Sequence, residues 1–131
     1  LGCLFLRLPH PLRSFHEFSP RQGQRWLRDR AQRLLDLGFY LSMSGIAAFP
    51  RSLEVRDIFA AAPVDRVLVE TDAPYLAPPP YRGKRNEPSY VEKTARFGAE
   101  VFGMDYADFA AQTQANFERL FSKVTSTAAA A

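Results

Sequence analysis

The sequence has 131 residues and a formal net charge of +3, from 17 basic and 14 acidic side chains. This length suits one domain with its own core, and so small a net charge is weak support for nucleic-acid binding. The single cysteine, Cys3, excludes an internal disulfide and favours a reducing, cytoplasmic location. Because neither a signal-peptide pattern nor an apolar run of about 20 residues is present, we predict no membrane segment.

The basic character belongs to the front of the chain. Residues 1–35 carry seven arginines against Glu17 and Asp29, a pattern more typical of a solvated segment than of a nucleic-acid-binding arm. Within it, His16 is either a metal ligand or an exposed loop histidine. Ser19 and Pro20 are typical of a helix start, and apolar residues at helical spacing up to Gly38 predict a helix over 21–37.

A strand, a helix and a second strand are expected next. Residues 39–45 alternate apolar and small polar side chains, which predicts a strand; we interpret Ser42 as a small residue needed for tight packing and Gly45 as a sharp turn. Ser52 is expected to cap a helix that Pro63 ends. The following strand would then run parallel to the first through a right-handed crossover.

The most informative stretch is residues 67–72. Val67, Leu68 and Val69 lack polar alternation, which favours a strand buried on both faces, and the prolines of residues 74–80 end it. Glu70 and Asp72 therefore lie at the carboxyl end of the strand, the edge at which α/β folds bind ligands. Asp72 is a candidate metal ligand; the alternative is that it caps the turn before the prolines.

The loop that follows is rich in donors. Arg82, Lys84, Arg85 and Asn86 can hold a phosphodiester, or form a solvated loop that packs against the protein. Tyr75, like Tyr81, can stack on a base or pack beneath the loop.

Two further helices are expected after this loop. Ser89 and Glu92 have the spacing of a capping box, and Gly103 ends the helix that they open. Asp105 is expected to cap a second helix through about residue 115, and residues 116–121 supply two or three core anchors. Residues 125–131 form a low-complexity tail.

Four motifs in order resemble the TatD-related metal-dependent deoxyribonucleases: residues 38–45, 70–76, 82–88 and 114–121. The resemblance covers about residues 34–124. It implies an α/β fold, the C-terminal half of a (β/α)8 TIM barrel of the amidohydrolase type, since a complete barrel takes roughly 250 residues. The expected organisation is a divergent basic segment over 1–33, a partial barrel over 34–124 and the tail; a frame-shifted or wrongly assigned gene start would also explain the divergent segment.

The resemblance also implies a chemistry. Asp72 matches the family's ligand aspartate, His16 matches a metal-binding histidine less closely, and Glu70 is expected to orient a ligand. A divalent ion, Mg, Mn or Zn, and DNA as the substrate of the complete enzyme follow. Further family ligands have no counterpart here, since His10 and His16 are the only histidines, so the chain alone is expected to be inactive. Two alternatives are a non-enzymatic remnant that binds nucleic acid or a protein through the basic loop, and self-association through open sheet edges.

Overall fold

The computed structural model describes the backbone of residues 3–4 and 20–122 and the side chains of residues 27–122. Within these ranges, one parallel sheet has the strand order β1 (Cys3–Leu4), β2 (Tyr40–Met43) and β3 (Val67–Val69). Leu41, Ser42 and Met43 of β2 lie opposite Val67, Leu68 and Val69 of β3. The strand at Val67–Val69 is confirmed, and it forms one edge of the described sheet.

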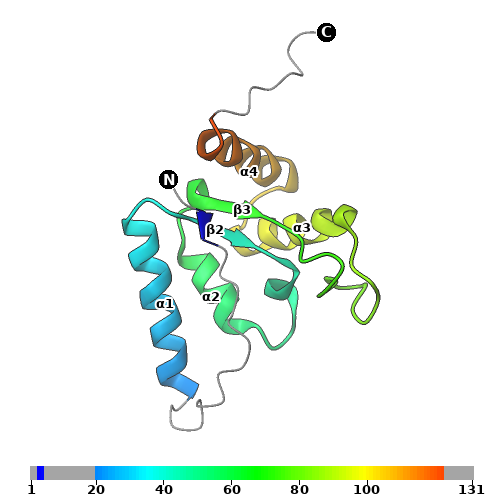
Figure 1. Cartoon of the computed structure of the whole chain (residues 1–131), viewed down its shortest axis with the longest axis horizontal. Coiled ribbons are helices and arrows are strands. Elements are labelled where there is room, and N and C mark those ends of the chain that lie inside the picture. The colour runs from blue at the N-terminus through cyan, green and yellow to red at the C-terminus, as the bar shows by residue number, and fades with distance from the viewer. Residues whose placement is uncertain (1–2, 5–19, 123–131) are drawn as a thin grey trace.

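Helices pack around this sheet (Figure 1). Helices α1 (Pro20–Asp36) and α2 (Leu53–Ala61) run side by side, whereas α4 (Tyr106–Leu120) lies beside β3, away from them, and contacts α3 (Val91–Phe102). Short 3-10 turns stand at Gly45–Ala48 (η2), Val64–Arg66 (η3) and Pro88–Tyr90 (η4). Within the described ranges, no helix is long and apolar enough to cross a membrane.

The core lies between the sheet and the helices. Leu41, Met43 and Val67 are fully buried in the strands, and Phe59 of α2 and Phe109 of α4 pack in the same apolar cluster. Phe109 reaches this position only because α3 carries a glycine where the two helices meet. A Cβ atom at Gly98 would lie 2.6 Å from two carbon atoms of the Phe109 ring.

Glycines end two of the helices as the sequence predicts. Gly38 follows α1 with φ of 84°, and Gly103 follows α3 with φ of 62°, a left-handed conformation that glycine adopts without steric cost. The backbone N–H of Met104 donates to the carbonyl of Ala99 over 2.9 Å, which closes the end of α3. The predicted helix over 21–37 is confirmed as α1 with a shift of one residue at each end.

The predicted capping box is wrong. Ser89 lies inside η4, and Tyr90 is the N-cap residue of α3, without a side-chain capping bond. Glu92 instead accepts a hydrogen bond of 2.8 Å from Nε of Arg96, four residues later on the exposed side of α3. A proline-initiated 3-10 turn therefore starts the helix.

Helix α4 is longer than predicted and runs through Leu120. The core anchor near its end is polar: Asn116 has no exposed surface, and its Nδ2 donates to the carbonyl oxygens of Val64, over 2.8 Å, and Val67, over 2.7 Å. Phe117 and Phe121, in the stretch expected to supply two or three core anchors, remain 45% and 40% exposed. The Asn116 side chain thus fastens α4 to the start of β3.

Candidate functional site

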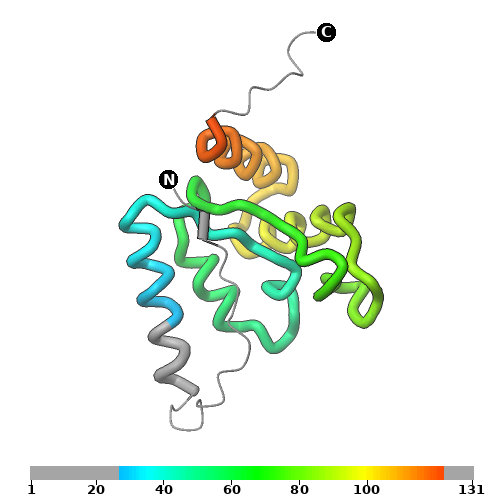
Figure 2. The backbone as a smooth tube through the Cα atoms, viewed as in Figure 1, coloured from blue at the N-terminus to red at the C-terminus, as the bar shows by residue number. Residues whose placement is uncertain are grey.

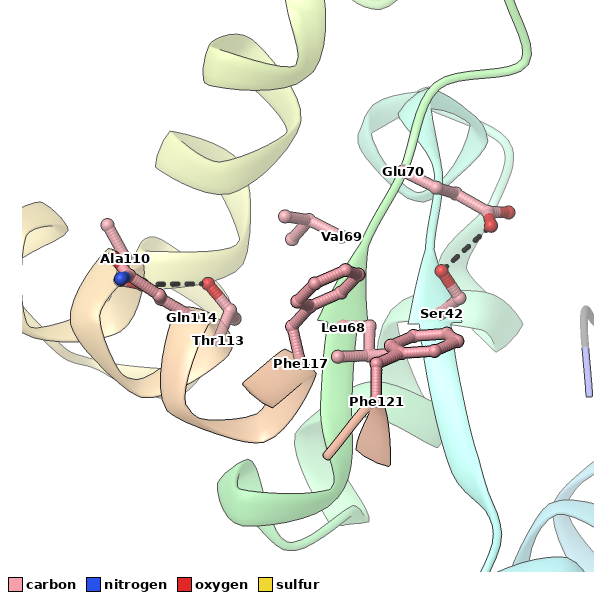
Figure 3. Close-up of a pocket in the computed structure, with 9 residues that line it drawn as sticks. All are labelled: Ser42, Leu68, Val69, Glu70, Ala110, Thr113, Gln114, Phe117 and Phe121. Atoms are coloured by element: carbon pink, nitrogen blue, oxygen red, sulfur yellow. Dashed lines mark hydrogen bonds between the residues drawn. The ribbon is translucent and has the colours of Figure 1, made fainter. Parts of the chain in front are cut away.

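The carboxylate of Glu70, which directly follows β3, lies beside β2 as well. Ser42 of β2 donates its Oγ hydrogen to Oε2 of Glu70 over 2.8 Å, and the backbone N–H of Glu70 donates to the carbonyl of Met43 over 2.9 Å. Because Ser42 pairs with Leu68 in the parallel register, its side chain and that of Glu70 meet at the same edge of the sheet (Figure 3). Ser42 therefore does more than fill space, which the sequence interpretation of this residue missed.

The Glu70 carboxyl is half-buried, and its surroundings change its acidity. Burial raises the pKa of the Glu70 carboxyl above its usual value, the hydrogen bond from Ser42 lowers it in part, and the negative charge of Asp72 raises it again. The net effect is upward, so Glu70 holds its proton to a higher pH than a free glutamate.

The segment after Asp72 is folded into a compact loop by its own backbone. The N–H of Tyr75 donates to the carbonyl of Asp72 over 2.8 Å, which makes a tight turn. Farther along, Asn86 ties the end of the loop to its beginning. Its backbone N–H donates to the carbonyl of Pro74 over 3.0 Å, and its Nδ2 donates to the carbonyl of Tyr75 over 2.6 Å. This loop lies on the side of the molecule opposite α1 (Figure 2).

Asn86 was expected to bind substrate, and the structure places its side chain beneath the loop. Its side chain is only 3% exposed, and its Nδ2 is used to hold the Tyr75 carbonyl. A buried amide that bonds to backbone fixes the shape of a loop and does not present its donors to solvent. Asn86 therefore positions the neighbouring residues of the loop.

The other predicted contact residues of the loop face solvent. Arg82, Lys84 and Arg85 are exposed, and Tyr75 is 72% exposed. The guanidinium of Arg82 lies 3.8 Å from the centre of the Phe49 ring, a cation–π contact that keeps its charge at the surface. The loop thus presents three cations and one free aromatic ring.

Tyr81 has the packing role that the sequence analysis left open. Its ring stacks on that of Tyr90, with 4.0 Å between ring centres and 11° between the planes. This stack joins the loop to the start of α3.

Gly45 brings the loop close to the sheet. A Cβ atom at this position would lie 3.1 Å from the Leu76 carbonyl oxygen and 3.2 Å from Cβ of Pro78. The φ value of Gly45 is not positive, so close packing against the loop, and not a special turn conformation, explains glycine here. The chain does turn at Gly45, where η2 begins, and the close contact with the loop is a second reason for glycine at this position.

The family model of the TatD related DNases matches residues 15–122. The chain belongs to this family. It is 49% identical over 94 residues to the uncharacterized metal-dependent hydrolase YcfH of Escherichia coli K12, a match that covers 72% of this chain and 36% of YcfH. It is 38% identical over 99 residues to the 3'-5' ssDNA/RNA exonuclease TatD of Klebsiella pneumoniae, covering 72% of this chain and 38% of that protein.

Two solved structures have the same fold. The TatD homologue YJJV of Escherichia coli K12 superposes with a TM-score of 0.67 at 26% identity, over 72% of this chain and 37% of that one. An uncharacterized amidohydrolase of Saccharomyces cerevisiae gives 0.63 at 20% identity, over the same shares of the two chains, and bears on the fold alone. The predicted fold class, part of an amidohydrolase (β/α)8 barrel, is confirmed, and the chain spans little more than a third of its relatives' length.

Relatives of the TatD family are metal-dependent hydrolases by name, so the donor atoms of this chain are of interest. Glu70 and Asp72 offer carboxylate oxygens, which hard divalent cations prefer. His16 lies outside the described residues, and residues 27–122 contain no cluster of three or more metal-ligating side chains. The described residues therefore do not form a complete divalent-metal site on their own.

Proposed function

We propose that this chain supplies part of the active site of a divalent-metal-dependent hydrolase that cleaves phosphodiester bonds in DNA. The observation that carries the proposal is the position of Glu70 and Asp72 directly after a buried strand, at the ligand-binding edge of an amidohydrolase-type sheet. The match to a relative named as a single-stranded DNA and RNA exonuclease supports a nucleic-acid substrate.

Each residue at this edge has a proposed role. Asp72 contributes a carboxylate ligand to the ion, whose identity as Mg, Mn or Zn is left open. Glu70, which Ser42 holds in place, orients neighbouring groups and remains a candidate catalytic residue. His16 is the second proposed metal ligand, and the remaining ligands come from parts of the barrel that this chain does not match.

The exposed loop residues are the proposed contacts to DNA. Arg82, Lys84 and Arg85 carry positive charges that attract phosphate oxygens, and the free ring of Tyr75 offers a face on which a base stacks. Asn86 holds this loop from beneath. Removing one of the three cations is expected to weaken binding uniformly across sequences, because phosphate contacts carry no sequence information.

The proposal is tested in a hybrid barrel. This chain replaces the matched residues of the Klebsiella exonuclease, and release of nucleotides from labelled single-stranded DNA is measured with Mg and with Mn. We expect activity in the hybrid, a loss of at least about 100-fold in Asp72→Asn, and no turnover by the 131-residue chain alone.

The matched control is Asp57→Asn, which removes an exposed carboxylate of α2 that pairs with the exposed Arg28. Its activity is expected to equal that of the parent hybrid. A folded hybrid without activity, or equal activity in the Asp72 and Asp57 variants, would refute the proposal.

A non-enzymatic function is the second candidate, and the exposed cations of the loop favour it. The free chain then binds DNA through Arg82, Lys84 and Arg85 with an affinity that falls steeply with salt but ignores chelators and Asp72→Ala. Fluorescence anisotropy with a labelled oligonucleotide measures this. Binding that a chelator abolishes would contradict this second function.

A further inference from the structure

Four arginines of residues 27–122 lie over aromatic rings, and Arg82 is the closest to its ring. Its guanidinium carbon lies 3.8 Å from the centre of the Phe49 ring, whereas the other three distances are 4.2, 5.1 and 5.2 Å. A guanidinium this close is in van der Waals contact with the face of the ring. Such a contact holds the cation without occupying its N–H donors with an acceptor oxygen.

The N–H donors distinguish Arg82 from the other three arginines, which use theirs on the protein itself. Their acceptors, at 2.8–3.1 Å, are the Ala47 and Phe49 carbonyls for Arg56, the Tyr40 hydroxyl for Arg66 and the Glu92 carboxylate for Arg96. Within residues 27–122, the Arg82 side chain makes no hydrogen bond or ion pair. Arg82 is therefore held by a ring while its donors remain directed to solvent.

Phe49, which holds Arg82, is itself fixed by its backbone. Its N–H donates to the carbonyl of Ile46 over 2.9 Å, which closes η2, and its carbonyl accepts the bond from Nη2 of Arg56 on α2. The segment η2 follows β2 at the end of the sheet where the loop lies (Figure 1). The ring of Phe49 thus belongs to the packed framework of the sheet, whereas Arg82 belongs to the loop.

We infer that Arg82 is the cation of the loop that binds one internal phosphodiester of single-stranded DNA at a fixed place, and that Phe49 is its positioning residue. A guanidinium with available N–H donors matches the two non-bridging oxygens of a phosphodiester. Lys84 and Arg85, whose side chains make no ring contact, hydrogen bond or ion pair within residues 27–122, attract DNA without fixing its place. The inference rests on the proposed function, because it assigns separate roles within the loop proposed to contact DNA.

The first test compares the same substitution at two arginines of the loop. Binding of the 131-residue chain to a labelled oligothymidylate with a 5'-hydroxyl is measured by fluorescence anisotropy, at fixed salt and with a chelator that prevents hydrolysis. Arg82→Lys keeps the charge but removes the planar fork, so we expect Kd to rise at least about fivefold. Arg85→Lys is the matched control and is expected to change Kd less than about twofold.

The second test is a double-mutant cycle on Phe49. Phe49→Leu removes the ring but keeps an apolar side chain, and loss of an exposed cation–π contact is expected to raise Kd about two- to fivefold. The same substitution in an Arg82→Ala chain should leave Kd unchanged, whereas a merely structural role of Phe49 would weaken binding in both backgrounds. Without DNA, the ring shifts the side-chain NMR signals of Arg82, and Phe49→Leu should move them toward those of Arg85.

The outcomes are decisive in both directions. Weaker binding with Arg82→Lys but not with Arg85→Lys, together with an effect of Phe49→Leu that requires Arg82, supports the inference. Equal effects of the two lysine substitutions, an effect of Phe49→Leu that persists in Arg82→Ala, or no binding by the parent chain would overturn it. So would binding that requires a 5'-phosphate on the probe, since the phosphate would then be a terminal one.

Failure of this inference differs from failure of the proposed hydrolysis. The binding assay involves neither a metal ion nor turnover, whereas the hybrid barrel reports the release of nucleotides. An inactive hybrid therefore counts against the hydrolysis, and equal binding by the Arg82→Lys and Arg85→Lys chains counts against the phosphate site.

Discussion

The bonds of Asn116 predict that Asn116→Ala strongly destabilises the chain. The substitution leaves the buried Val67 carbonyl without its partner at 2.7 Å, which costs about 1–3 kcal/mol. The Val64 carbonyl loses its bond of 2.8 Å but keeps the Val67 N–H, so this second loss is about 0.5–1 kcal/mol. The expected decrease in the free energy of unfolding is therefore roughly 1.5–4 kcal/mol.

Urea denaturation followed by circular dichroism measures this decrease, and thermal melting supplies a second reading. For a domain of about 100 residues, each 1 kcal/mol lowers the melting temperature by roughly 4–8 °C. The control is Gln114→Ala on the same helix, which removes an exposed bond to Glu118 and is expected to cost less than about 0.5 kcal/mol. If Asn116→Ala is no more destabilising than this control, the assignment of Asn116 as the link between α4 and β3 is refuted.

Three other substitutions have expected outcomes. Gly98→Ala places a Cβ 2.6 Å from the Phe109 ring and is expected to cost about 1–3 kcal/mol by urea denaturation, although alanine favours helices; an unchanged midpoint would contradict the packing. Glu70 has a raised pKa, so its charge costs stability as pH rises through the folded-state pKa. Glu70→Gln should then melt higher than the parent chain at pH 8, with the difference vanishing below pH 4.5, and a pH-independent difference would show this reasoning to be wrong. Gly45→Ala is expected to loosen the loop and speed tryptic cleavage after Lys84, whereas an unchanged rate means that the loop adapts.

Local patterns in the sequence predict the elements whose causes are local. Gly38 and Gly103 end helices because the chain needs a left-handed residue there, and that requirement is readable from one position. The buried strand at Val67–Val69 follows from a short apolar run before prolines. These signals depend on neighbours in the chain, so they persist in the structure.

Contacts between residues far apart in the sequence explain the predictions that failed. Asn116 bonds to a carbonyl 49 residues away, and Ser42 bonds to a carboxylate 28 residues away. The local sequence around each residue therefore does not include its partner. The capping box failed because Pro88 starts a 3-10 turn, which shifts the beginning of α3 past Ser89. For the candidate site, sequence could name the carboxylates and the cations but not that Asn86 is buried beneath them.

Both backbone groups of Val67 are already hydrogen-bonded within the chain, and this limits where a neighbouring strand can align. The N–H of Val67 donates to the carbonyl of Val64 and its C=O accepts from Asn116. Among the described residues of β3, a neighbouring strand therefore finds its first unbonded groups at Val69 and cannot slide toward the start of β3. A slip of one residue would turn every side chain of that strand to its opposite face, away from Phe117 and Phe121. One buried asparagine thereby excludes alignments that use Val67 and helps protect the edge against aggregation.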